Sequence, residues 1–162
     1  MNTQNFHIGA GAISIDGKDV GATTPNGVVV NYEPNIHLHE SGKYGKTPVK
    51  ASLIGRLLTV EMELAESTLL NMSRVFAGAE TEGTSPNITK VKFGGIAGVE
   101  VEGKTVVLTP YDGTPAWTFR NAIPSSPVAM NYTVEDERVF KVTMTAMVDS
   151  GVPEDENIAF VS

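Results

Sequence analysis

The sequence predicts a mainly β protein: two packed antiparallel sheets, arranged as a β-sandwich or partly open barrel, with one flanking α-helix. Three observations lead to this fold class. Long segments alternate between apolar and polar residues, which is typical of half-buried strands. Stretches rich in Gly, Pro and Asn separate these segments and mark turns. Only one segment, near residues 67–77, has the wider apolar spacing of an amphipathic helix.

The N-terminal third of the chain predicts strands joined by turns. The segment "NFHIGAGAISIDG" is predicted to be a strand that ends in a turn at Asp16-Gly17. In "VVVNYEPNIHLHESG" apolar residues alternate on both sides of Pro34, which predicts two strand halves. Because proline cannot donate a hydrogen bond to a sheet, Pro34 marks an edge strand or a bulge. The next segment, "ESGKYGKTPVK", is a polar connection that is too long for a tight hairpin.

The stretch "RLLTVEMELAESTLLNMSRVFAGAE" changes its apolar period halfway. Its first half belongs to a predicted strand from about Val49 to Ala65, and the two faces of this strand differ. We expect one face in the core, and it consists of Leu58, Val60, Met62 and Leu64. We expect most of the other face in water, and it consists of Leu57, Thr59, Glu61 and Glu63.

After Glu66 the spacing becomes helical, and one short amphipathic helix is predicted. Glu66 or Ser67 is a candidate N-cap, and Gly78 suits a left-handed residue past the C-terminal end. The apolar stripe of this helix consists of Leu69, Met72 and Phe76.

The second half of the chain predicts further strands within the same domain, residues 1–162. A loop is predicted at 79–87, then two or three short strands in 88–113 with a turn at Glu102-Gly103, and two or three more in 116–151. The tail "VPEDENIAFVS" is acidic and then apolar, so we expect it to dock. The last strand has an apolar side, Phe140, Val142, Met144, Ala146 and Val148, and a polar side, Lys141, Thr143 and Thr145.

Composition narrows the classes of function. The chain has no cysteine, which excludes disulfides, thiolate metal sites and cysteine nucleophiles. Its formal net charge is −7, so a groove that grips nucleic acid by its phosphates is disfavoured. No run approaches the ~18 apolar residues of a membrane span.

Signals for catalysis and ligand binding are weak. His37 and His39 lie two residues apart and could hold a metal ion with Glu33 or Glu40. More simply, they are polar residues on the wet side of a strand. Trp117 could stack on a sugar, but its position beside apolar neighbours favours a core or interface role. The sequence contains no G-x-S-x-G, P-loop or H-E-x-x-H motif. We therefore expect a protein that is not an enzyme and needs no cofactor.

The order of these elements resembles the tail-tube (major tail) proteins of tailed bacteriophages. The resemblance rests on the strand ending "VVVNYEPNIHLHESGKYGKTPVK", the long strand "ASLIGRLLTVEMELAE", the helix "STLLNMSRVFAGA" directly after it, and the closing "YTVEDERVFKVTMTAMVD". It spans roughly Gly27 to Asp149. The resemblance consists of the hydrophobic pattern and the order of the elements, and it includes no invariant chemical motif.

The resemblance implies a structural virion protein. Six copies would form a ring by joining their inner sheets into one barrel, and stacked rings would form the hollow tube that conducts DNA from the capsid to the host. It implies tape-measure, tail-tip and tail-terminator partners, and a sheath protein if the tail is contractile. The expected location is the virion tail, and the host cytoplasm during assembly. The expected lumen-facing residues are Thr59, Glu61, Glu63, Lys141, Thr143 and Thr145.

Two more surfaces follow from the resemblance. The loop after the first long strand is expected to contact the next ring. The helix is expected to lie outside the ring wall and to seal the contact between neighbouring subunits through Leu69, Met72 and Phe76. The expected inter-ring residues are Glu40, Ser41, Gly42, Lys43, Tyr44, Gly45 and Lys46.

Three other interpretations stay open. The same fold serves the inner tube of type VI secretion and of other contractile injection systems. A monomeric, carbohydrate-binding β-sandwich would instead place its ligand on Trp117 or Tyr111. An enzyme would use His37 and His39 with a metal ion.

Overall fold

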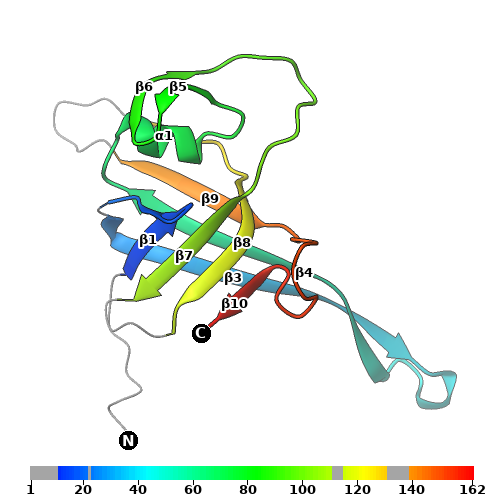
Figure 1. Cartoon of the computed structure of the whole chain (residues 1–162). Coiled ribbons are helices and arrows are strands. Elements are labelled where there is room, and N and C mark those ends of the chain that lie inside the picture. The colour runs from blue at the N-terminus through cyan, green and yellow to red at the C-terminus, as the bar shows by residue number, and fades with distance from the viewer. Residues whose placement is uncertain (1–10, 22, 111–114, 131–138) are drawn as a thin grey trace, which may run out of the picture.

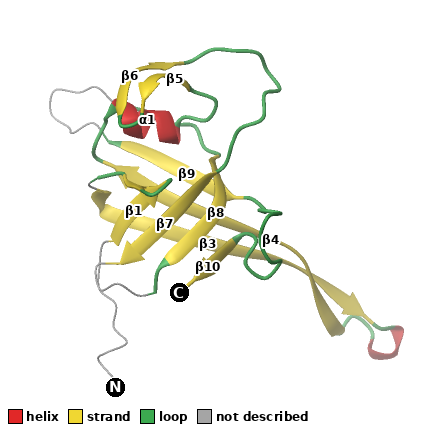
Figure 2. Cartoon of the chain, viewed as in Figure 1, coloured by secondary structure: helices red, strands yellow, loops and turns green. Residues whose placement is uncertain are grey.

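The computed structural model describes residues 11–21, 23–110, 115–130 and 139–162, and it is mainly β with one α-helix (Figures 1 and 2). This confirms the fold class expected from the sequence. The elements are β1 (Gly11–Ile15), β2 (Lys18–Asp19), β3 (Thr23–Glu40), β4 (Pro48–Leu64), α1 (Leu69–Val75), β5 (Glu80–Thr84), β6 (Asn87–Lys92), β7 (Lys104–Pro110), β8 (Trp117–Pro124), β9 (Phe140–Ala146) and β10 (Ala159–Val161).

The two layers are the two halves of one bent sheet, where the sequence predicted two separate sheets. The strand order is β2-β1-β7-β8-β9-β4-β3, and β10 pairs with β8 away from this path. In β8 the residues 117–119 pair with β10 and the residues 122–124 pair with β9. The sheet bends at this strand, so that β1, β7 and β8 cross over β3 and β4 (Figure 1). No closed barrel forms within the described residues of the chain.

The core lies between the two layers and collects apolar side chains from both. The predicted core face of β4 is buried, with Val60, Met62 and Leu64 at most 2% exposed. The opposite layer contributes Ile13, Val106 and Phe119, each at most 1% exposed. Burial of these side chains is the main favourable contribution to folding of the two layers together.

The first hairpin is formed as the Asp-Gly pair predicts. Asp16 has φ 53° and Gly17 has φ 71°, the left-handed conformations that a two-residue hairpin turn needs at both positions. Thr105 donates a backbone hydrogen bond to the Asp16 carboxylate, at 3.2 Å. The turn is thereby tied to β7, the next strand of the sheet.

The long hairpin of β3 and β4 extends far beyond the body of the domain (Figure 1). β3 is the edge strand, and its pairing with β4 shifts register between Asn35 and Ile36, next to Pro34. This confirms the edge or bulge expected at the proline. The strands continue past it, so β3 is one bent strand. We call residues 32–57, which project from the domain, the arm.

The helix is present, but its N-cap differs from the prediction. Thr68 is the N-cap, and its Oγ1 accepts a hydrogen bond from the Asn71 amide at 3.1 Å. The buried helix residues are Asn71, Arg74 and Val75. The Asn71 side chain donates to the carbonyl of Val20 at 2.7 Å. The backbone carbonyls of the neighbouring turn need hydrogen-bond donors, and for this reason the polar side chain of Asn71 faces inward.

The connections on either side of β6 differ from the sequence prediction. Residues 80–84 form β5 and pair with β6 in a small separate hairpin, where a loop was predicted. Gly83 permits this pairing, because a Cβ there would lie 2.4 Å from the Asn87 carbonyl oxygen. Residues 93–103 contain no strand, and the hairpin predicted around Glu102-Gly103 does not form. β7 begins directly after that glycine.

The C-terminal elements follow the pattern with one exception. Val142 and Met144 are buried, as the alternation of β9 predicts. The strand ends at Ala146, however, and Val148 is 57% exposed. The acidic and apolar tail docks, because β10 pairs with β8. In the described segments of the chain, no helix is long and apolar enough to cross a membrane.

The opposite faces of β4 predict opposite effects of truncation. Met62→Ala removes a side chain that is 2% exposed and should lower the free energy of unfolding by about 2–5 kcal/mol. Leu57→Ala, on the other face and 45% exposed, should change it by less than about 0.5 kcal/mol. Urea unfolding of single subunits measures both. Equal losses would show that the strand faces are assigned wrongly.

Candidate assembly surfaces

The residues predicted to face a lumen lie together on one side of β4 and β9. They form three directly opposed pairs across the two strands. Directly opposed residues in an antiparallel pair share a face, so the six side chains form one continuous patch. These pairs are Thr59 with Thr145, Glu61 with Thr143, and Glu63 with Lys141. We call this patch, with Asn31, the polar face.

The carboxylates of the polar face have partners. Lys141 Nζ lies 2.6 Å from Glu63 Oε1. The hydrogen bond and the negative charge of Glu63 raise the pKa of Lys141. Glu61 Oε1 accepts a hydrogen bond from the side-chain amide nitrogen Nδ2 of Asn31 at 2.8 Å. The lysine that interrupts an otherwise acidic and hydroxyl-bearing patch is therefore neutralised by its neighbour.

Sequence reasoning missed two polar groups at this face. Asn31 lies opposite Thr59 on β3. In the sequence, Asn31 stands out as a polar residue after three valines. Which residue lies beside it depends on the β3–β4 register, which the sequence does not give. Ser125 Oγ lies 2.7 Å from Thr145 Oγ1. It belongs to the segment "PSSP", which resembles a turn in the sequence and gives no indication of β9 as its neighbour.

The arm carries an uncovered apolar face. On β3 and β4 the core residues Val30 and Val60 are followed, on the same side, by the opposed pair Tyr32 and Leu58. Beyond this pair the domain no longer covers that side. It continues along the arm with residues that are 46–54% exposed: Tyr32, Ile36, Leu38 and Leu53. Ile54, the extra residue at the bulge, is 65% exposed. Contiguous apolar surface of this kind marks an interaction site.

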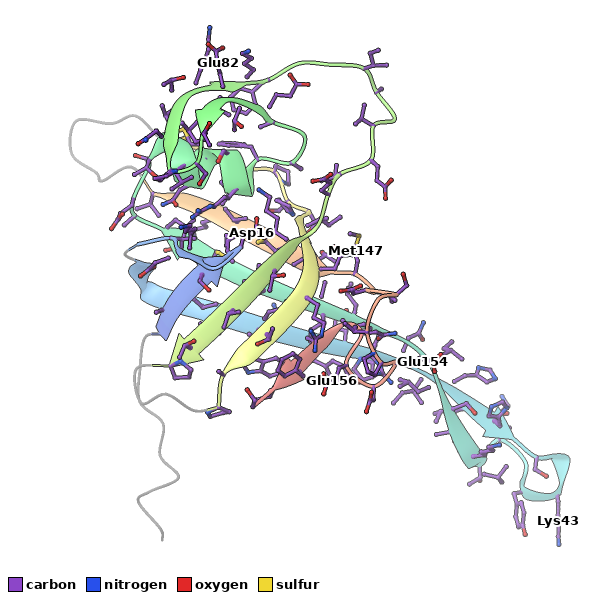
Figure 3. All side chains as sticks on the ribbon, in the orientation of Figure 1. Asp16, Lys43, Glu82, Met147, Glu154 and Glu156 are labelled. Carbon is purple, nitrogen blue, oxygen red and sulfur yellow. The ribbon has the colours of Figure 1, made fainter. Side chains whose placement is uncertain are left out.

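The residues predicted to contact a next ring form the far end of the arm. Glu40 is the last residue of β3, and Gly42–Tyr44 form one turn of 3-10 helix with Ser41 as its N-cap. Gly45 has φ 66° and reverses the chain toward Lys46 and β4. The tip is basic and aromatic, with Lys43 Nζ 5.5 Å from the centre of the Tyr44 ring. These seven residues therefore lie together, at the point farthest from the domain body (Figure 3).

The three helix residues predicted to contact a neighbouring subunit have different positions. Leu69 is 41% exposed and Met72 is partly exposed. Phe76 lies past the helix and packs on the core, with its ring 5.2 Å from that of Phe93. Leu69 and Met72 are thus available to a partner, whereas Phe76 anchors the helix to its own domain.

The histidine pair lies on the polar side of the arm. The His37 and His39 rings are 4.5 Å apart in an edge-to-face arrangement, and His39 Nε2 lies 3.0 Å from Ser52 Oγ. Among the described residues, no Asp or Glu joins them in a group of three potential metal ligands. The two candidate third ligands, Glu33 and Glu40, do not complete the set.

Trp117 lies at the base of the arm. Its ring stacks on Phe119 at 5.9 Å and packs against the core. Its exposed edge lines a cavity of about 360 Å³ together with Tyr32 and the C-terminal segment 155–161. Tyr111, the other residue considered for a sugar site, lies outside the described residues.

A basic cluster lies between α1 and β7. Arg74 is 5% exposed, and its Nη1 has no hydrogen-bond partner among the residues that the structure describes. Burial lowers the pKa of both Arg74 and Lys104, and the nearby negative charge of Asp16 opposes this effect. Lys104 Nζ donates to the Ser73 carbonyl at 3.3 Å. The negative charge of Asp16 therefore favours the charged forms of both Arg74 and Lys104.

The ion pair of the polar face predicts a pH-dependent contribution to stability. The folded pKa of Lys141 is raised above 10.5, so its pair with Glu63 stabilises the fold below that pH and is lost as the pH rises through the folded value. Lys141→Met should cause a small loss of stability at pH 8, typical of an exposed pair and reduced by salt. Above the titration range of Lys141, the difference from wild type should vanish.

Urea unfolding at pH 8, 10 and 11 measures this effect, with Lys90→Met as the control at an exposed lysine of β6. A loss in Lys141→Met that stays constant at pH 11 would show that the lysine stabilises the fold by packing and not by charge.

The chain has no match among protein-family models, and none among curated protein sequences. A function must therefore be argued from the tail-tube resemblance and from the surfaces described above: the polar face, the apolar face of the arm and the arm tip.

Proposed function

We propose that this protein is the subunit of a bacteriophage tail tube, a structural virion protein without catalytic activity. Six copies would form a ring, and stacked rings would form a hollow tube for the passage of DNA. The tube would end at tail-tip and tail-terminator proteins and enclose a tape-measure protein during assembly. The proposal extends the sequence resemblance with the properties of two surfaces.

The uncovered apolar face of the arm is the observation that carries the proposal. Ile36, Leu38 and Leu53 are about half exposed on a hairpin that leaves the domain. Such a hairpin loses the conformational freedom of its side chains without burying them, unless a second molecule covers it. A subunit that stacks on another copy supplies this cover in every ring.

The exposed edge of β3 supports closure into a ring. A long, unpaired strand edge invites pairing with another chain, and a barrel removes all such edges. The layer of β3, β4, β9 and the C-terminal half of β8 offers four strands. Six such layers give ~24 strands spaced ~4.8 Å apart, and hence a wall on the order of 40 Å in diameter. B-DNA, roughly 20 Å wide, fits inside.

The polar face suits the inside of such a wall. It carries two glutamates, three threonines and one lysine that is paired with Glu63. Its negative charge would repel phosphates and let DNA slide without being held. The apolar side of the same strands is in the core, so the polar side is the one left for the lumen.

Electron microscopy of the purified protein tests the proposal directly. Negative-stain images at micromolar and then at much higher concentration should show rings or tubes with a pore a few nanometres wide. If only small particles form, a tail-tip complex is added as a nucleus. Single subunits that persist with the nucleus present would refute the proposal.

Deletion of the arm tip should block stacking. Removal of residues 41–45 takes away the 3-10 turn and shortens the portion of the arm that reaches a neighbour. We expect soluble subunits or single rings, at least tenfold fewer tubes in electron micrographs, and an unchanged core. Substitution of Lys90 and Lys92 by alanine, remote from the arm, is the control. Normal long tubes from the deletion variant would contradict a role of the tip in stacking.

Charge reversal on the polar face should affect DNA and leave assembly intact. Glu61→Lys/Glu63→Lys removes the pair with Lys141, which should cost little stability because that lysine is exposed. The tube should therefore still form, because neither side chain is in the core. Tubes of this variant should retain duplex DNA in a sedimentation assay, and virions that carry it should eject DNA poorly. Glu80→Lys/Glu100→Lys, which has the same net charge, should behave as wild type. If both double variants pass DNA equally well, the polar face does not line the lumen.

The inner tube of a contractile injection system is the second candidate, and the same surfaces fit it. A monomeric carbohydrate-binding module is supported less well, because the Trp117 ring stacks on Phe119 and packs against the core. That module would also leave the apolar face of the arm unexplained.

A further inference from the structure

The tip of the arm has a distinct chemistry within an acidic chain. It presents one aromatic ring, Tyr44, 58% exposed, between Lys43 and Lys46. Lys50 lies farther down the arm, and Glu40 is the nearest carboxylate in the sequence. With a net charge of −7 for the whole chain, the tip is a local basic site that fits an acidic and aromatic surface.

An aromatic cavity with one carboxylate in its lining lies at the base of the arm. It measures about 360 Å³ and is lined by Tyr32, Trp117 and Phe160, with Leu58 also in its wall. Asp155 and Asn157 lie at its C-terminal side, and Arg56 contributes a guanidinium that can stack on an aromatic ring. We call this cavity the socket. Glu154, next to Asp155, is exposed on the same side of the domain (Figure 3).

The arm is long enough to meet a second copy before the domain body does. β3 continues from Tyr32, where the core ends, to Glu40, a span of about 27 Å in extended conformation. The 3-10 turn Gly42–Tyr44 lies beyond that end. A copy stacked in the direction of the arm would therefore meet the tip first.

We infer that the arm tip of one copy docks in the socket of the next copy, with Tyr44 among the socket aromatics and Lys43 beside Asp155. This inference rests on the proposed stacking of copies and names the two surfaces that meet. Aromatic anchors that fill a pocket commonly dominate the energy of such contacts, and opposite charges fix their orientation. The same contact places the apolar face of the arm against the neighbouring copy.

A disulfide between copies tests the contact in a chain that has no cysteine of its own. Lys43→Cys/Asp155→Cys is assembled at high concentration, oxidised mildly and run on a non-reducing denaturing gel. Both positions are exposed, so the subunit should fold normally. Lys43→Cys/Lys90→Cys, which pairs the tip with an exposed site on β6, is the matched control.

We expect a ladder of dimers, trimers and longer multimers from Lys43→Cys/Asp155→Cys, at least tenfold stronger than from the control. Tubes in the microscope without this ladder would overturn the socket and leave the proposed function standing. Crosslinking that stops at dimers would support the socket but indicate a closed two-fold pair, and would contradict stacking. If the variant forms neither tubes nor crosslinks, both the socket and the proposed function are contradicted.

Charge exchange gives a second, independent measurement. Lys43→Glu places a carboxylate beside Asp155 and should reduce the amount of tubes at least tenfold. Adding Asp155→Lys should restore most of the lost tubes, because the two charges are again opposite. A double variant that assembles no better than Lys43→Glu would contradict this pairing.

Discussion

The antiparallel pairing of β3 with β4 is the interaction on which the rest of the structure depends. It runs from the centre of the domain to the end of the arm, with register shifts at Asn35 and near both ends. Within the domain body, one face of the ladder supplies the core through Val60, Met62 and Leu64. Along the arm, the same face is about half exposed in the part of the chain that the structure describes. A single continuous ladder therefore supplies both the core of the domain and the apolar face that we propose for assembly.

The position of the polar face is set by the burial of the opposite side of the same strands in the core. Alternation sends Thr59, Glu61 and Glu63 away from the core, and β9 meets them with its own polar side. Burial of the core fixes the register, because a shift by one residue would bring these glutamates inside. The ion pair of Glu63 with Lys141 is thus a consequence of packing on the opposite side of the sheet.

Several features were predictable because they depend on local chemistry or on alternation. The Asp16-Gly17 turn, the irregularity beside Pro34, the buried side of β4 and the docked tail all occur as the sequence indicates. The helix was found in the right segment, but the sequence did not indicate which of its residues would be buried in the domain. A helix of two turns has no stable face of its own, and its orientation depends on which neighbour needs donors. Asn71 meets that need at Val20.

The sequence by itself determined most of the long strands, their two-sided character and the absence of cysteine chemistry, because period and composition are properties of the chain alone. Tertiary structure decided that the two layers are one bent sheet, that β5 and β6 pair, and that Lys141 lies beside Glu63. It also decided that the apolar side of the arm extends past the core. These features depend on register and on contacts between residues far apart in sequence, which no local pattern specifies.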